Sequence, residues 1–247
     1  IRRSYTYMML TQESYLEINK LDNLNDCINA IGNNIDVAKI NYIYLKEQKY
    51  ETVWELQKQL HLLVKEKKLP DLVLFLEHEH VYTFGKNANE DFLLDSRIEN
   101  AEVVHTDRGG QVTYHGPGQL IGYPIINLNF HKKSVSWFMR SLEQIIIDTL
   151  SAFNIESNRK EGLPGVWVND EKICAMGVRI AQWVTMHGFA LNINPEMKYF
   201  DGMIPCGILN HGVTSLKGLI DEDIKNEKII KVLMKNFNLT FNRNNEV

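Results

Sequence analysis

The stretch from Arg108 to Gln119 restricts the possible folds of this chain more than any other. Its sequence, Arg-Gly-Gly-Gln-Val-Thr-Tyr-His-Gly-Pro-Gly-Gln, is rich in glycine, which allows positive φ and a close approach of the backbone to a ligand. Thr113 and Tyr114 favour a strand, and so does the apolar run 120–126 that follows. We therefore predict a strand, a Gly-Pro-Gly turn and a second strand, with bare backbone facing a pocket. A plain β-hairpin without a site is the alternative interpretation.

Several classes of function are disfavoured by the sequence. The glycines match neither the dinucleotide-binding nor the P-loop spacing. A formal charge of −4 argues against a general nucleic-acid binder, which carries a basic surplus. No apolar run is long enough to span a bilayer, so no membrane role is expected. The cysteines Cys27, Cys174 and Cys206 have no paired spacing, which indicates a reducing compartment and neither a disulfide framework nor a zinc site.

Hydrophobic periodicity predicts an α+β fold, because strands are mixed with well-separated helices without strict βαβ alternation. Strands are expected at 40–45, 72–76, 81–85, 103–106, 120–128, 166–168, 173–183 and 184–194, and helices at 50–68, 134–153 and 221–237. Ser134 is the expected N-cap of the second helix, and Asp221, Glu222 and Asp223 are expected at the positive end of the last. Residues 1–39 are predicted to be a polar N-terminal extension, ahead of a single catalytic domain over 40–247.

Two cysteines are candidate nucleophiles. Pro205 and Gly207 place the thiol of Cys206 on constrained backbone with little neighbouring bulk, although an isolated cysteine is more often a small buried hydrophobic residue. An ordinary thiol is mostly protonated near neutral pH, so it needs a base or a cation nearby. Lys172 could provide one if it is desolvated, whereas a lysine in such a turn-to-strand segment is more often a solvated surface charge. Cys174 shares a strand face with Lys172 and competes with Cys206 on geometry alone.

Histidines near the glycine-rich stretch have several possible roles. His115 could orient a substrate, act as an acid-base group or cap the turn, and its position favours a place in the site. Residues 77–80, Glu-His-Glu-His, put alternate side chains on one strand face, as in a metal site. No third ligand of suitable spacing accompanies them, so no metal centre is expected there.

The glycine-rich stretch resembles the signature of the lipoyl(octanoyl) transferases, which move octanoyl groups from acyl carrier protein onto lipoyl domains. The resemblance continues in order over about residues 41–219, through the segments 77–78, 81–85, 164–168, 172–180, 187–194 and 205–208. Their co-occurrence is far more specific than any one motif. Glu79 departs from the family pattern, which usually has proline at that position.

This resemblance implies the fold of the biotin and lipoate protein ligases, a mixed β-sheet flanked by helices. It implies Cys206 as the nucleophile that forms an octanoyl thioester, Lys172 as the general base and thiolate partner, and Cys174 as a packing residue. It implies no metal, no ATP and no other cofactor. Backbone amides near 175–177 would stabilise the oxyanion. The implied substrate-binding residues are Arg108, Gly109, Gly110, Gln111, Val112, Thr113, Tyr114, His115, Ala175, Met176, Gly177, Gly188, Phe189 and Ala190.

The implied partners are octanoyl-acyl carrier protein as donor and, as acceptors, lipoyl domains of 2-oxoacid dehydrogenase complexes or the glycine cleavage H protein. Because these partners tend to be acidic, a basic rim around the pocket is expected, with Arg108, Arg159, Lys160 and Arg179 as candidates. The start at Ile1, with Arg2 and Arg3, and the Asn-rich extension favour an organelle, either plastid or mitochondrial matrix. The cytoplasm is the alternative.

Three other functions stay open at this level. An ATP-dependent lipoate-protein ligase shares the fold and an equivalent lysine, but its glycine loop resembles a triple-glycine pattern where this chain has Gly109-Gly110-Gln111, and it lacks the cysteine. A lipoyl amidotransferase of the same fold also uses a cysteine and differs in its donor. A non-catalytic binding module for the carrier protein is the third.

Overall fold

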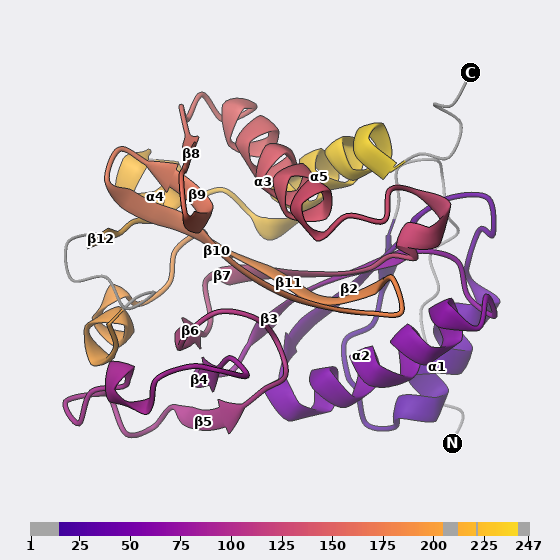
Figure 1. Ribbon diagram of the computed structural model, residues 1–247, viewed down its shortest axis with the longest axis horizontal. Coiled ribbons are helices and arrows are strands. Elements are labelled where there is room, and N and C mark those ends of the chain that lie inside the picture. Colours follow the sequence, from indigo (N-terminus) through magenta and orange to yellow (C-terminus); the bar gives the residue numbers. More distant parts are fainter. Residues whose placement is uncertain (1–14, 205–211, 221, 242–247) are drawn as a thin grey trace.

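The computed structural model describes residues 15–204, 212–220 and 222–241. A large mixed sheet crosses the molecule, with helices on both of its faces and a smaller sheet beside one of them (Figure 1). The predicted α+β class, with a mixed sheet flanked by helices, is confirmed.

The bounds of the elements agree with most of the expected segments. The strands are β1 (Leu16–Glu17), β2 (Asn41–Gln48), β3 (Leu72–His78), β4 (Val81–Phe84), β5 (Glu102–His105), β6 (Thr113–His115), β7 (Gln119–Ile125), β8 (Asn158–Lys160), β9 (Leu163–Val168), β10 (Glu171–Ala181), β11 (Val184–Asn192) and β12 (Gly212–Val213). The helices are α1 (Leu24–Asn33), α2 (Tyr50–Lys65), α3 (Val135–Ser151), α4 (Leu216–Leu219) and α5 (Asn226–Phe241), with 3-10 turns η1 (Glu90–Phe92), η2 (Leu128–Phe130) and η3 (Met197–Gly202).

The large sheet has the strand order β1-β2-β3-β7-β11-β10-β9-β8, and β12 pairs with β10. The small sheet has the order β5-β4-β6. The long hairpin of β10 and β11 turns at Gln182 and Trp183, which both have positive φ, as a two-residue hairpin turn requires. Neighbouring positions on β7, β11 and β10 therefore form one continuous surface on each face of the sheet.

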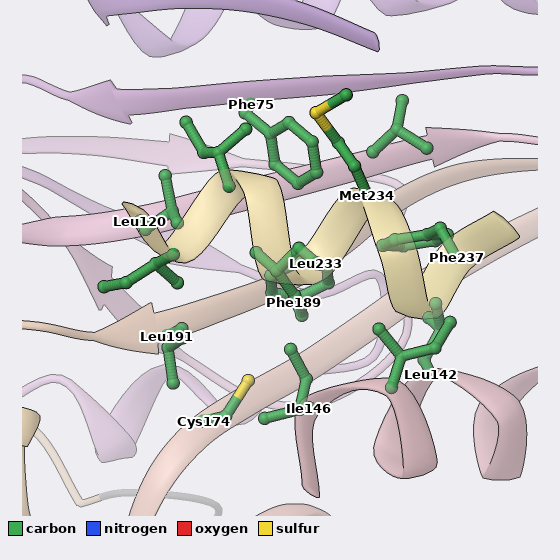
Figure 2. Close-up of a cluster of buried hydrophobic side chains, with 14 of the residues drawn as sticks. Phe75, Leu120, Leu142, Ile146, Cys174, Phe189, Leu191, Leu233, Met234 and Phe237 are labelled. Carbon is green, nitrogen blue, oxygen red and sulfur yellow. The ribbon is translucent and has the colours of Figure 1, made fainter. Parts of the chain in front are cut away.

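One face of the sheet is covered by α3 and α5 (Figure 1). Figure 2 shows this core, in which Phe75 and Phe189 from the sheet meet Ile146 of α3 and Phe237 of α5. Burying each such side chain stabilises the fold by roughly 1.5–3 kcal/mol. The predicted N-cap is confirmed, since the Ser134 side chain accepts a hydrogen bond from the amide of Trp137, 3.2 Å away.

The other face is covered by α1 and α2, and the described part of residues 1–39 supplies one strand of the sheet and one helix of this cover. Within the described residues, β1 pairs with β2 in parallel, and α1 buries Cys27 and Ile31 in the core beneath the sheet. Asn23 caps α1 by accepting from the amides of Asn25 and Asp26. The apolar residues of α1 recur at helical spacing, and the surrounding asparagines conceal that period.

The glycine-rich segment is not a hairpin, although a strand lies on each side of its turn. β6 pairs with β4 in the small sheet, whereas β7 pairs with β3 and β11 in the large one. The Gly-Pro-Gly turn thus carries the chain from one sheet to the other. Gly118 has a φ of 83°, and a Cβ there would collide with the carbonyl of Asn194. Only glycine satisfies both constraints without strain.

The last helix begins later than expected. α5 starts at Asn226, so Glu222 and Asp223 precede it, and Asp221 lies outside the described residues. Ile224 is buried in the core before the helix begins, so residues 222–225 form a loop that packs against this core. Ile229, Leu233 and Phe237 are buried along one side of α5.

Candidate active site

A cavity of about 220 Å³ lies on the face of the large sheet that bears the glycine-rich segment. Three adjacent strands, β7, β11 and β10, form its floor, and the segment 108–115 closes over them. Its lining is Tyr50, Arg108, Gly110, Gln111, Val112, Thr113, His115, Gln119, Tyr123, Gly162, Leu163, Pro164, Lys172, Ala175, Met176, Gly177, His187, Gly188, Phe189, Ala190, Asn192, Phe200, Met203 and Val213. A mostly apolar lining with a few polar groups is typical of a small-molecule site.

The floor is made of small residues that face each other across two strands. Ala175 pairs with Ala190, and Gly177 pairs with Gly188. A Cβ on Gly177 would come within 2.8 Å of the carbonyl oxygen of Gly109, and one on Gly188 would collide with the backbone of Gly122. The absence of side chains here lets the glycine-rich segment rest on β10, where the Gly109 amide donates to the Val178 carbonyl at 3.0 Å. A narrow slot therefore lies between the backbone of the glycine-rich segment and the backbone of the strands beneath it.

Arg108 fixes the start of the glycine-rich segment. Its guanidinium is buried and donates to the carbonyl and hydroxyl of Thr83 on β4, and to the Gly109 carbonyl at 2.9 Å. The expectation that Arg108 belongs to a basic rim is therefore wrong. Its fork of donors instead ties this segment to the small sheet.

Lys172 lies near the start of β10 and lines the cavity with only 6% of its surface exposed. Its ammonium stands 4.7 Å from the centre of the Trp167 ring, a cation–π contact. Lys172 is therefore not the solvated surface charge that is more common in such a segment.

Cys174 does not share the face of Lys172. The pairing of β10 with β9 shifts register between these two residues, and this bulge breaks the alternation on which the expectation rests. The thiol of Cys174 packs among Ile146 and its neighbours in the core (Figure 2). Burial raises its pKa far above that of an ordinary thiol, so Cys174 is unsuited to nucleophilic attack.

His115 is held in one tautomer by a chain of hydrogen bonds. The carbonyl of Thr214 can only accept, so Asn192 presents its amide nitrogen to it at 2.9 Å and its oxygen to Gln119. The oxygen of Gln119 then faces Nδ1 of His115 at 2.8 Å, and that nitrogen must carry the proton. Burial lowers the pKa of His115 well below the ordinary value, which leaves Nε2 as an acceptor.

A second polar group lies beside His115, where Tyr50, Tyr123 and His187 meet, and the ring of Tyr50 stacks on that of His115 with 6.0 Å between centroids. The backbone of His187 has a φ of 58°, and its amide is held by Gln57 at 2.8 Å. Its ring contacts the Asp107 carboxylate at 2.8 Å. Burial lowers the pKa of His187, and the hydrogen bond from that ring lowers the pKa of Asp107. A buried histidine with left-handed backbone is a costly arrangement, and such arrangements concentrate at functional sites.

Most of the residues expected to bind substrate are brought together here. Of the fourteen, the cavity lining includes all but Gly109, whose backbone rests on β10, and Tyr114. Tyr114 packs with Tyr82 and Tyr199 in the core of the small sheet. Cys206 lies outside the described residues.

Sequence reasoning missed several lining residues. Tyr50, Gln119, Tyr123, Asn192, Phe200 and Met203 line the cavity without having been singled out. Gln119 and Tyr123 occur within a buried apolar strand, and a polar group in such a run is the one signal that could have indicated them.

The remaining rim candidates are each paired with a carboxylate. Arg159 contacts Glu143 at 3.0 Å, Lys160 contacts Asp170, and Arg179 contacts Asp107 at 3.1 Å. Their charge is thus partly neutralised within the chain.

Two further observations concern metals and membranes. In residues 15–204, 212–220 and 222–241 no three His, Cys, Asp or Glu side chains are grouped so as to hold a metal ion. Glu77 instead accepts from the Gly118 amide at 2.6 Å and supports the Gly-Pro-Gly turn. No helix in this part of the chain has the length and apolar character to cross a membrane.

Comparison with known proteins gives consistent results. A family model described as the lipoyl protein ligase A/B catalytic domain matches residues 49–238. A chloroplastic octanoyltransferase of Arabidopsis thaliana is 41% identical over 211 residues, covering 77% of this chain and 75% of the relative. An octanoyltransferase of Flavobacterium johnsoniae is 44% identical over 220 residues, covering 79% of this chain and 95% of the relative.

Solved structures share the fold at low sequence identity. LipL1 of P. falciparum in complex with lipoate aligns with a TM-score of 0.64 at 20% identity, covering 84% of this chain and 64% of that one. A bipartite lipoate protein ligase of Thermoplasma acidophilum aligns with a TM-score of 0.63 at 13% identity, covering 82% and 83%. The arrangement of strands and helices is therefore that of the lipoate protein ligases.

Proposed function

This chain belongs to the octanoyltransferases, within the lipoyl protein ligase A/B catalytic domain family, and from that premise we propose how it carries out octanoyl transfer in protein lipoylation. The donor is octanoyl-acyl carrier protein, the nucleophile is Cys206 and the base is Lys172. The observation that carries the proposal is the position of Lys172, buried against Trp167 at a slot whose floor is made of alanine and glycine.

In the first step the Cys206 thiolate attacks the thioester carbonyl of the donor. A carbon–sulfur bond to Cys206 forms, the bond to the carrier's thiol breaks, and Lys172 returns a proton to the leaving thiolate. One thioester replaces another, so this step is nearly balanced in free energy. Covalent catalysis of this kind divides one difficult transfer into two easier ones.

In the second step an acceptor lysine amine attacks the Cys206 thioester. Lys172 takes the proton from the attacking nitrogen, the carbon–nitrogen bond forms, and the thiolate is released for the next cycle. Formation of an amide from a thioester makes this step run downhill. General acid–base catalysis of this type contributes about 10²–10⁴-fold to a rate.

The described residues on either side of Cys206 support this assignment. Met203 and Val213 both line the cavity, and Val213 pairs with Lys172. The other two cysteines are poor rivals, because burial raises the pKa of Cys27 to about 12 and also raises that of Cys174.

The oxyanion that forms on the carbonyl needs nearby donors. Strand β10 pairs with β9 only as far as Cys174, and beyond it the strand runs under the glycine-rich segment. We assign stabilisation of the oxyanion to backbone amides near 175–177 on this stretch. The acyl chain then lies on Ala175, Ala190 and Gly177, below Gly110 and Val112.

The acceptors are lipoyl domains, either of 2-oxoacid dehydrogenase complexes or of the glycine cleavage H protein, and the compartment is an organelle. The similarity to a chloroplastic octanoyltransferase supports an organelle, and the similarity to a bacterial octanoyltransferase is the argument for the cytoplasm. A fusion of the chain to a fluorescent protein, imaged in plastid- and mitochondrion-bearing cells, tests the compartment.

Intact-mass measurement tests the reaction. Incubation with octanoyl-acyl carrier protein is expected to add one octanoyl group to the protein, and the adduct should be absent in Cys206→Ala and retained in Cys174→Ala. Loss of the adduct in Cys174→Ala alone would reverse the assignment of the nucleophile. Absence of any adduct, with the donor bound, would favour a binding module.

The other two enzymes of this fold are separated by the choice of donor. Transfer that depends on ATP and free lipoate would indicate a lipoate-protein ligase. Transfer from a lipoylated domain in preference to acyl carrier protein would indicate an amidotransferase.

A further inference from the structure

The tyrosines Tyr50 and Tyr123 stand diagonally opposite Lys172 across the cavity floor. Gly177 lies five residues after Lys172 on β10, a rise of about 16 Å, and pairs with Gly188. Phe189 pairs with Gly122, so Tyr123 lies beside Gly188, two strands away from β10. An acyl chain whose carbonyl is near Lys172 and whose tail follows the small-residue floor is therefore directed at these rings.

The hydrogen bonds of the Tyr123 and Tyr50 hydroxyls each have only one possible direction. Nδ1 of His78 lies 2.9 Å from the Gln48 carbonyl, which can only accept, so that nitrogen carries the proton. Nε2 of His78 then accepts from the Tyr123 hydroxyl at 2.8 Å. Tyr50 is held in the same way. The Asp107 carboxylate can only accept, so Nε2 of His187 donates to it, and Nδ1 of His187 accepts from the Tyr50 hydroxyl at 3.5 Å.

The chain of donors from Tyr123 through His78 ends on the main chain and is buried throughout. His78 is fully buried, and burial lowers its pKa to about 4, so the ring is neutral near pH 7 and the direction of the chain does not reverse. Moving either ring to admit more ligand would leave a buried donor or acceptor without its partner.

From this geometry we propose that Tyr50 and Tyr123 form the end wall that sets the acyl chain length. The proposal rests on the proposed octanoyl transfer and names the residues that decide its substrate. A longer chain would have to displace a ring that its hydrogen bonds hold in place, whereas a shorter one would leave the far end of the slot unfilled. The floor does not provide such a stop, because alanine and glycine make it open along its whole length.

Hydroxyl deletion is the direct test. Tyr50→Phe and Tyr123→Phe keep the rings, but each removes the hydrogen bond from the hydroxyl to its buried histidine, and Tyr50→Phe leaves the bond from Tyr123 to His78 intact. Tyr42→Phe is the matched control, because it also loses a buried hydroxyl, bonded to Asn238 at 2.7 Å, but in the core below α5. Hexanoyl, octanoyl, decanoyl and dodecanoyl carrier proteins are compared by kcat/KM, and the free fatty acids of the same lengths by calorimetry.

The wild-type protein is expected to prefer octanoyl over decanoyl. In both wall variants the decanoyl-to-octanoyl ratio should rise about tenfold, the effect of accommodating two more methylenes, while Tyr42→Phe keeps the wild-type ratio. An unchanged ratio in both wall variants, with octanoyl transfer retained, would overturn the proposal. If the wild-type protein transfers no octanoyl, the proposed function fails. The length cut-off for the free fatty acids, and its shift in the variants, then decides the wall separately.

Discussion

At the scale of single residues, Lys172 and Lys160 form a natural comparison. Both ammonium groups stand over the ring of Trp167, at 4.7 Å and 5.0 Å. Lys172 is buried and lines the cavity, whereas Lys160 contacts the exposed carboxylate of Asp170. The two lysines thus contact the same aromatic ring, but only Lys172 faces the slot.

Lys172→Met is expected to lower kcat for octanoyl transfer by about 10²-fold or more, since no other group in the proposed reaction takes the proton from the attacking amine. The methionine keeps the apolar contact with Trp167, so the thermal midpoint should change little. Steady-state kinetics and thermal denaturation of the same preparations provide the measurement.

Lys160→Met is the control, and it is expected to retain kcat within about threefold, with any effect confined to KM for the protein partner. Equal losses of kcat in the two variants would show that Trp167 packing, and not the position of the amine in the slot, accounts for the effect of Lys172→Met.

At the scale of secondary-structure elements, the sequence predicted those segments whose apolar period is undisturbed. The stripe of α3 and the apolar run of β3 are of this kind, and both are buried as expected. Helix α1 was missed because its apolar residues, of which Cys27 and Ile31 are buried, are interspersed with asparagines. Pairing could not be predicted either, because the strand propensity of Thr113 and Tyr114 is local, whereas the choice of β4 over β7 as partner is made by the tertiary fold.

The candidate site shows the same division between local and tertiary information. Glycines 109 and 110 were predictable from the residues themselves, because a chain uses glycine where backbones approach closely, whereas glycines 177 and 188 were named only through the family resemblance. Tyr123 was not, because within β7 it has the pattern of a core residue, and only its hydrogen bond to His78 gives it a different role. Lys172 and Cys174 lie on different faces of β10 because of a β-bulge between them, and no residue type in the sequence predicts that bulge.

Gly32 in α1 provides a test of whether this helix belongs to the cooperative fold. Nothing lies within 4 Å of the position that a Cβ would take there. Gly32→Ala should therefore raise the free energy of unfolding by about 0.5–1 kcal/mol, because alanine loses less backbone entropy in a helix. Urea denaturation followed by circular dichroism measures this. An unchanged free energy of unfolding would mean that α1 unfolds separately from the sheet.

At the scale of the whole molecule, the slot places three histidines in the interior. His78, His115 and His187 are each nearly or fully buried, and burial is the largest cause that lowers the pKa of each. For His78 the pKa falls to about 4. The free energy of unfolding therefore falls in acid, because the unfolded chain can bind protons that the buried neutral imidazoles of the folded chain cannot.

The sign of the effect follows directly. These folded-state pKa values lie below the unfolded value of about 6.5, so the stability contributed by the neutral rings is complete above that pH. It is lost as the pH falls from about 6.5 toward 4, the folded value for His78. Each histidine can remove up to about 1.4 kcal/mol per pH unit in this window. Asp107, whose pKa is lowered, loses its contribution only at more acidic pH, below the ordinary carboxylate range.

Urea unfolding between about pH 7.5 and pH 5 should therefore show a free energy of unfolding that is constant above about pH 7 and decreases below it. His78→Gln should flatten the decrease, because glutamine can donate to the Gln48 carbonyl and accept from Tyr123 without taking up a proton. A wild-type curve that stays flat to pH 5 would mean that the buried rings titrate at their ordinary pKa. In that case the slot admits enough water to hydrate them, and the rigid end wall of Tyr50 and Tyr123 would lose its physical basis.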